Sequence, residues 1–264
     1  MAEREKLYIF HLFRKDGTSL FLHPFLSTDN LVIKLERAVI EGRYGNEPRV
    51  EALTMFRNEL YRRIEAGVKS WISEIRFIPK FLISSGIFLA AYFAMAFVIR
   101  DPLPVLDEAA IGLGAAIVTY LLLGRRYLTS ERATKKRLSL RIIVDKIIFR
   151  ESKFVRQVES ALHRNETDRP EEVIKQIVEP SKQEFGDPFK EEAGQFIQLL
   201  ENRFNFKRLK KEEKILKKFI KNRTPGEEMN YIKKRMKSRN LDFPLYAVYK
   251  CFKKTVSNSK IKDR

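Results

Sequence analysis

The sequence predicts a mainly α-helical protein with a two-helix transmembrane hairpin in mid-chain. A small N-terminal module of a β-hairpin and helices precedes it, and a helical cytoplasmic C-terminal domain follows it. Three observations predict this class: two long uncharged segments, basic residues at their outer ends, and helical periodicity elsewhere. The expected segments are the module at 1–76, the hairpin at 77–124, a basic juxtamembrane stalk at 125–165 and the C-terminal domain at 166–264.

The first uncharged segment is FLISSGIFLAAYFAMAFVI at 81–99, which has 19 residues. As a helix it is about 28 Å long, close to the roughly 30 Å of a bilayer's hydrocarbon. Ten of its residues are Leu, Ile, Phe or Val, each contributing about −0.3 to −0.6 kcal/mol toward insertion. We therefore predict a membrane-spanning helix; the alternative is a helix buried in a large soluble domain.

The second uncharged segment, AAIGLGAAIVTYLLL at 109–123, is shorter. A helix over about 104–123 is long enough to span but includes Asp107 and Glu108. These acids would lie near the interface, where a charge costs less than at the midplane. Prolines between the two segments favour a tight turn and thus a hairpin. A re-entrant second segment is the alternative.

Both apolar segments carry small residues at four-residue spacing. They are Gly86, Ala90 and Ala94 on the first segment and Gly112 and Ala116 on the second. Small residues let helix backbones approach closely in lipid, where van der Waals packing drives association. We predict that they pack helices together, either within the hairpin or between chains of a homo-oligomer.

The basic residues predict the orientation of the hairpin. Five Lys or Arg lie in the 20 residues before the first segment, seven lie in the 20 after the second, and the connecting loop has only Arg100. The cations closest to the segments are Arg76, Lys80, Arg125 and Arg126. By the positive-inside rule, both termini are expected in the cytoplasm, with the hairpin in the cytoplasmic (inner) membrane.

The polar parts have their own elements. Aromatic-rich runs around an Asp-Gly turn predict a β-hairpin at 6–26, followed by a helix over about 27–41 and an amphipathic helix from about 48 to 75. Residues 125–162 are mostly helical in pattern and could pair with the 48–75 helix as a stalk, although 141–149 also resembles a strand. Further helices are predicted at 170–179, 188–222, 226–238 and 244–257.

Most of the net charge of +18 lies near the C-terminus, since residues 203–264 have 21 basic and 6 acidic side chains. We predict that this region binds anionic lipid headgroups or an acidic protein. The cations assigned to this role are Lys207, Arg208, Lys210, Lys211, Lys214, Lys217, Lys218, Lys233, Lys234 and Arg235. A solvated basic face and a nucleic-acid partner remain alternatives, and no nucleic-acid-binding motif supports the latter.

The sequence offers little chemistry. It lacks the phosphate-loop, zinc-protease, nucleophile-elbow and kinase signatures, so no enzyme activity and no catalytic residue are predicted. A single cysteine and three dispersed histidines predict no metal site, and no cofactor is expected. The predicted function is an integral membrane anchor or assembly protein, a scaffold whose basic domain binds a partner or lipid. The alternatives are a subunit of an oligomeric channel or transporter, and a membrane-tethered nucleic-acid-binding protein.

Overall fold

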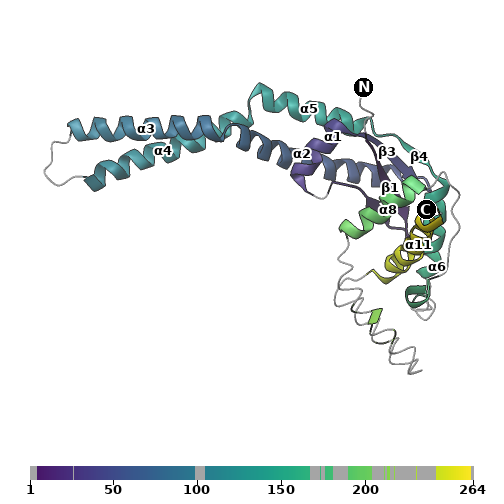
Figure 1. The fold of residues 1–264 in the computed structure, drawn as a ribbon. Helices are drawn as coiled ribbons and strands as arrows, with labels where there is room; N and C mark the ends of the chain where they lie inside the picture. The colour runs from purple at the N-terminus through teal and green to yellow at the C-terminus, as the bar shows by residue number, and fades with distance from the viewer. Residues whose placement is uncertain are drawn as a thin grey trace. The chain divides into compact units, whose positions relative to one another are not determined.

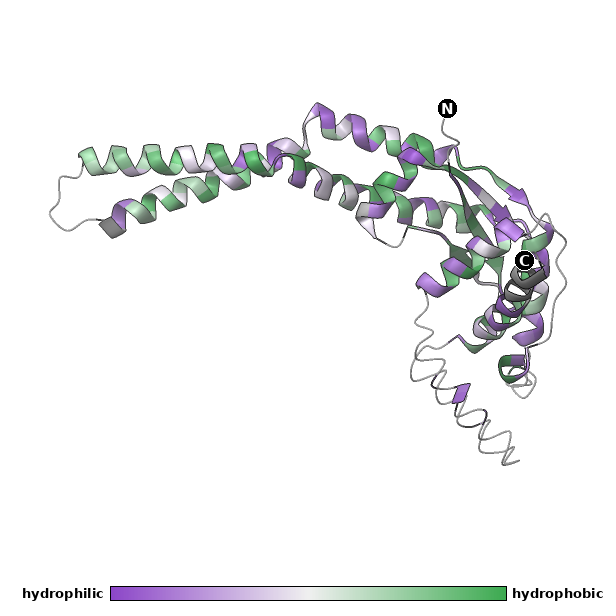
Figure 2. Ribbon diagram, viewed as in Figure 1, coloured by the Kyte–Doolittle hydropathy of each residue, from purple (hydrophilic) through white to green (hydrophobic). Residues whose placement is uncertain are grey.

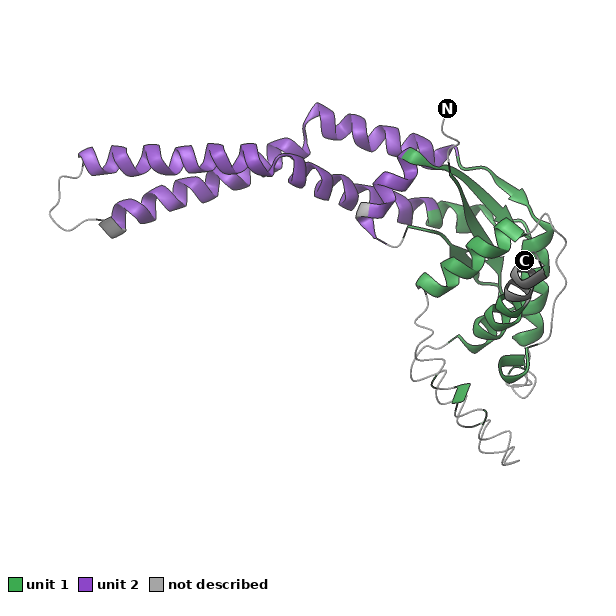
Figure 3. Cartoon of the chain, in the orientation of Figure 1, with its two compact units in different colours: residues 1–26, 37–56, 147–264 green, residues 27–36, 57–146 purple. Residues whose placement is uncertain are grey.

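The computed structural model of the chain is mostly helical, as predicted, and has a small mixed sheet that contains the predicted β-hairpin. It describes residues 5–25, 27–98, 105–166, 173, 176–180, 190–203, 211, 213–214, 217, 230 and 242–262. The chain forms two compact units (Figure 3). Unit 1 comprises residues 1–26, 37–56 and 147–264, and unit 2 comprises residues 27–36 and 57–146. The units are interleaved along the chain, whereas the sequence suggested consecutive segments.

The sheet belongs to unit 1 and has the strand order β2-β1-β3-β4; Figure 1 labels β1, β3 and β4. Its strands are β1 (Lys6–Phe13), β2 (Ser19–Leu22), β3 (Val39–Tyr44) and β4 (Phe149–Glu151). β1 and β2 are antiparallel and form the predicted hairpin, with Phe10 opposite Leu22. Gly17 in their turn has φ 82°, a backbone conformation that favours glycine. β3 is parallel to both β1 and β4.

The predicted helix over about 27–41 is wrong in its second part. Helix α1 (Thr28–Arg37) ends early, and Val39 begins β3 instead. Pairing with β1 and β4 fixes this strand, a long-range contact that local helix signals do not report. Gly42 is needed there for close packing, because a Cβ at this position would lie 2.5 Å from the Phe149 ring. In the ambiguous 141–149 region, helix α5 (Glu131–Asp145) is followed by the short strand β4.

The main core of unit 1 joins the two ends of the chain. Two helices, α6 (Lys153–Asn165) and α8 (Lys190–Arg203), pack on β1, and a third, α11 (Phe243–Lys262), packs on these two helices. The ring of Phe10 lies 6.1 Å from that of Phe154 and 5.5 Å from that of Phe196, and Phe154 lies 5.7 Å from Phe252. The N-terminal strand and the C-terminal helices therefore share one core.

The apolar hairpin is inserted in the connection between β3 and β4. Parallel neighbouring strands require a crossover connection. Here residues 45–148 supply it. The helices in this stretch are α2 (Val50–Ile75), α3 (Phe77–Val98), α4 (Val105–Leu128) and α5. Both ends of the insertion thus return to hydrogen-bonded strands of one sheet.

Unit 2 contains two successive pairs of antiparallel helices. In the first, α5 lies against α2: Arg141 donates to Glu65 at 2.8 Å, and Arg132 lies 5.5 Å from the Trp71 ring centre. This is the stalk pairing that the sequence suggested. In the second, α3 and α4 lie side by side over most of their length (Figure 1).

A buried carboxylate ties α6 to the ends of two strands. Glu159 is 1% exposed and accepts hydrogen bonds from the Phe13 N–H and from Asn46 Nδ2, both at 2.9 Å. Burial raises the pKa of Glu159, while these hydrogen bonds and nearby His163 act in the opposite direction without reversing the rise. Gly45 leaves the space for this carboxylate, since a Cβ there would lie 2.4 Å from Glu159 Oε2.

Gly45→Ala should therefore destabilise the protein by about 1–3 kcal/mol, because the added methyl also meets the Arg156 backbone at 2.8 Å. The measurement is denaturant unfolding of the full-length protein. Gly194→Ala is the control: nothing lies within 4 Å of its added Cβ, and alanine favours the helix by about 1 kcal/mol. Equal effects of the two substitutions would contradict the role of Gly45.

Candidate functional site

The most unusual surface of the described chain is the outward face of α3 and α4. Two stretches, Phe77–Phe97 and Asp107–Leu128, are long and apolar enough to cross a membrane, yet only 6% and 11% of their most apolar windows are buried. Figure 2 shows the hydrophobic colour on both helices. The exposed large side chains include Phe81, Leu82, Ile87, Leu89, Phe93 and Phe97 on α3 and Ile111, Leu113, Ile117, Val118, Leu121 and Leu122 on α4.

The five small residues predicted to pack helices divide into two groups. Gly112 is buried against α3, where its Cβ would lie 3.1 Å from the Phe88 carbonyl oxygen, and Ala116 is half-buried one turn later. Gly86, Ala90 and Ala94 are exposed, and nothing lies within 4 Å of a Cβ at Gly86. The structure thus brings the α4 pair into the hairpin contact and leaves the α3 stripe on the outward face.

Basic and aromatic side chains gather at one end of this hairpin. We call the group the collar; it comprises Trp71, Arg76, Lys80, Tyr120, Arg125, Arg126, Tyr127 and Arg132. The Lys80 ammonium lies 3.4 Å from the Tyr120 ring centre, and the Arg76 guanidinium lies 5.3 Å from that of Tyr127. Both distances are those of cation–π contacts. The four residues predicted to set the topology all belong to the collar.

The three aromatic residues of the collar were not predicted from the sequence. Trp71, Tyr120 and Tyr127 each contact a basic side chain of the group. Their chain positions near the ends of the apolar segments were a usable signal, because Trp and Tyr are enriched at membrane–water interfaces. What the sequence did not show is which cation each ring contacts.

Several cations of unit 2 outside the collar have carboxylate partners. Away from the hairpin, Arg137 and Arg141 each lie 2.8 Å from a carboxylate oxygen of Glu65, and Lys136 pairs with Glu36. Within the described residues, no ion pair to a carboxylate joins any of the five collar cations. Part of the positive charge on α2 and α5 is therefore paired with carboxylates, whereas the charge of the collar is not, within the described residues.

Of the ten predicted C-terminal cations, three lie within the described residues. Lys211 and Lys214 are exposed, and Lys217 lies 3.1 Å from Glu213. The others, Lys207, Arg208, Lys210, Lys218, Lys233, Lys234 and Arg235, lie outside the described residues. Burial favours a raised pKa for Glu213, but hydrogen bonds from Lys217, Lys250 and Tyr246 outweigh it and lower the pKa overall.

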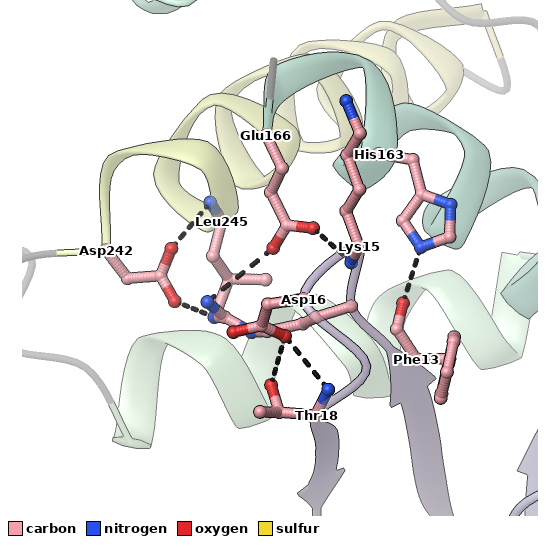
Figure 4. A network of polar contacts seen from close by, with 9 residues as sticks. Phe13, Lys15, Asp16, Thr18, His163, Glu166, Asp242 and Leu245 are labelled. Carbon is pink, nitrogen blue, oxygen red and sulfur yellow. Dashed lines mark hydrogen bonds and ion pairs between the residues drawn. The ribbon is translucent and has the colours of Figure 1, made fainter. Parts of the chain in front are cut away.

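Other polar clusters in unit 1 hold structural elements together. Figure 4 shows polar contacts between the β1–β2 turn and the ends of α6 and α11. Arg14 pairs with Asp242 and lies 3.6 Å from Glu166, which also accepts from the Lys15 N–H at 2.9 Å. His163 Nε2 donates to the Phe13 carbonyl at 2.8 Å. Both carboxylates are engaged, so this cluster offers no free acid–base pair.

His11 has a pKa well below its ordinary value. It is fully buried, lies 3.0 Å through Nε2 from Ser19 Oγ, and its ring centre is 4.9 Å from that of Phe21. Burial lowers its pKa from 6.5 to about 4, against a smaller opposing effect of the Asn46 backbone. It is therefore neutral at pH 7.

Among the described residues, no group of three or more His, Cys, Asp or Glu could hold a metal ion.

Comparison with known proteins finds no matching family model, no matching curated protein and no matching solved structure. The functional proposal accordingly depends on the geometry of the apolar hairpin and the collar.

The Gly112 contact predicts a difference between two neighbouring glycines. Gly112→Ile should force α3 and α4 apart, whereas Gly114→Ile should not, since nothing lies within 4 Å of a Cβ at Gly114. Spin labels on cysteines at Ile87 and Ile117, with Cys251→Ser, measure the separation. A longer or broader distance only in the Gly112 variant is expected; unchanged distances would contradict the contact.

The His11 environment predicts a pH-dependent stability. Because its folded pKa of about 4 lies below the unfolded value of 6.5, protonation favours unfolding. The resulting loss of unfolding free energy is absent above pH 6.5 and grows as pH falls toward 4, where it reaches roughly 3 kcal/mol. His11→Gln, which does not titrate, should weaken the loss of unfolding free energy over this interval. An identical pH profile in both proteins would contradict the assignment.

Proposed function

We propose that the protein is an integral membrane anchor or assembly protein whose α3–α4 hairpin crosses the bilayer. The observation that carries the proposal is the outward apolar face of two adjacent helices, which the described chain leaves uncovered. A soluble protein would bury such helices in its core. Lipid removes their surface from water without further protein contacts.

The dimensions support two full spans. α3 has 22 residues and α4 has 24, so they are about 33 and 36 Å long, against roughly 30 Å of hydrocarbon. The charged side chains of these helices lie toward their ends: Lys80 in α3, and Asp107, Glu108, Arg125 and Arg126 in α4. The length of α4 favours a span over a re-entrant segment.

The topology of the sheet supports a common side for both ends of the hairpin. Because β3 and β4 are paired, the chain that enters the hairpin and the chain that leaves it belong to one folded unit. A folded sheet cannot be divided by a bilayer. The basic collar at this end favours the cytoplasmic side, which would place unit 1 in the cytoplasm.

The anchor would present the basic C-terminal region to a partner. Residues 203–264 carry a net charge of +15, and Lys211 and Lys214 are exposed. This supports binding of an acidic protein or of anionic headgroups; for headgroups weak attraction is sufficient, since tethering keeps the region close to the membrane surface.

One matched pair of substitutions tests the membrane proposal. Leu89 in α3 and Leu138 in α5 are 51% and 53% exposed. Leu89→Arg would place a charge near the membrane centre, at a cost of about 2.5–3.5 kcal/mol, and should reduce the fraction of protein that resists alkaline carbonate extraction. Leu138→Arg should have no such effect.

If both positions faced water, the two variants would behave alike. Full extraction of the wild-type chain by carbonate would also contradict the proposal.

A further inference from the structure

The collar combines features that suit a phosphate group. Arg76, Lys80, Arg125, Arg126 and Arg132 bring five positive charges to one end of the α3–α4 hairpin, and no ion pair to a carboxylate is found for them within the described residues. Elsewhere in the same unit, four cations have carboxylate partners at 2.6–2.8 Å: Arg63, Lys135, Arg137 and Arg141. Unneutralised arginines favour phosphate, which their planar guanidinium groups bind through two hydrogen bonds.

Aromatic rings hold part of this charge in place. Tyr127 and Tyr120 lie against Arg76 and Lys80, and Trp71 lies 5.5 Å from Arg132. A cation over a ring keeps its N–H donors available to an anion, whereas a carboxylate partner would occupy them. Arg125 and Arg126 are exposed in the last turn of α4. The collar therefore has some hydrogen-bond donors whose side chains are positioned by aromatic rings, and others on exposed arginines.

The position of the collar selects the source of the phosphate. The collar is continuous with the apolar faces of α3 and α4: Lys80 is followed at once by exposed Phe81 and Leu82, and Arg125 is preceded closely by exposed Leu121 and Leu122. A ligand matching this surface has an anionic head and long apolar chains. A phospholipid has both parts, while a free phosphate or a nucleic acid has no apolar chains.

We propose that the collar binds the headgroup of an anionic phospholipid whose acyl chains lie along α3 and α4. This inference rests on the proposed membrane anchor and adds a lipid class and a binding site to it. It differs from the role proposed for the C-terminal cations, because the collar is a separate group in unit 2.

The test is lipid selectivity of the full-length protein in phosphatidylcholine vesicles that contain a trace of spin-labelled phosphatidylglycerol or spin-labelled phosphatidylcholine. The motionally restricted fraction should favour phosphatidylglycerol by about fivefold, the effect of a single nearby charge. The combined variant Arg76→Gln, Arg125→Gln, Arg126→Gln should lose this preference. High salt should weaken it as well.

Two variants serve as controls. The combined substitution Arg57→Gln, Arg62→Gln, Lys146→Gln removes the same charge from unit 2 outside the collar and should keep the preference. The combined substitution Arg76→Lys, Arg125→Lys, Arg126→Lys keeps the charge and should retain at least part of the preference. If the collar and non-collar glutamine variants lost the preference for phosphatidylglycerol equally, the preference would depend only on the net charge of the protein. That result would overturn the proposed site.

The remaining outcomes separate the two proposals. If the wild-type protein resisted carbonate extraction but restricted the motion of both labelled lipids equally, the lipid site would be overturned. The proposed membrane anchor would not be affected by that result. No restricted lipid together with full carbonate extraction would overturn the anchor itself. If glycerol phosphate without acyl chains displaced the labelled lipid at comparable concentration, the site would be one for free phosphate and not for a phospholipid.

Discussion

The apolar surface of α3 and α4 is the constraint on which the rest of the structure depends. Each helix carries large apolar side chains around most of its circumference, but the hairpin contact covers one strip of each. Phe97, at 80% exposure, shows how little the described chain does to cover the remainder. The hydrophobic effect makes such a surface unstable in water, so it needs cover that the described residues do not provide.

The place of the hairpin in the chain has consequences for folding. Strands β3 and β4 pair directly, although the whole of α2 to α5 separates them in sequence. The core around Phe10 also needs Phe154, Phe196 and Phe252, which follow the hairpin in the chain. Unit 1 therefore cannot complete its core before the hairpin has been made. Contacts between residues so far apart in the sequence have a high entropic cost of loop closure, and the packing of aromatic rings offsets this cost.

Charge is distributed according to what surrounds it. In unit 1, the buried Glu159 carboxylate accepts hydrogen bonds from one backbone N–H and one side chain. The Glu213 carboxylate accepts hydrogen bonds from the side chains of Tyr246 and Lys250. These groups stabilise the fold. Collar cations such as Arg125 are exposed and lack such partners within the described residues. A charge without a protein partner is tolerated at a surface that water or anionic groups can reach, and such a charge is available for recognition.

The sequence by itself determined the two apolar helices, the β1–β2 hairpin and the long helix α2, because each depends on local length, periodicity or turn chemistry. It also located the basic residues at the hairpin's ends. Only the tertiary structure decided that Val39 begins a strand, since that strand is held by pairing with β1 and β4. It likewise decided that Gly112 lies in the helix contact while Gly86 faces outward, which depends on the rotation of each helix about its axis. Spacing in a sequence shows that residues share a face, but the direction of that face is fixed by packing.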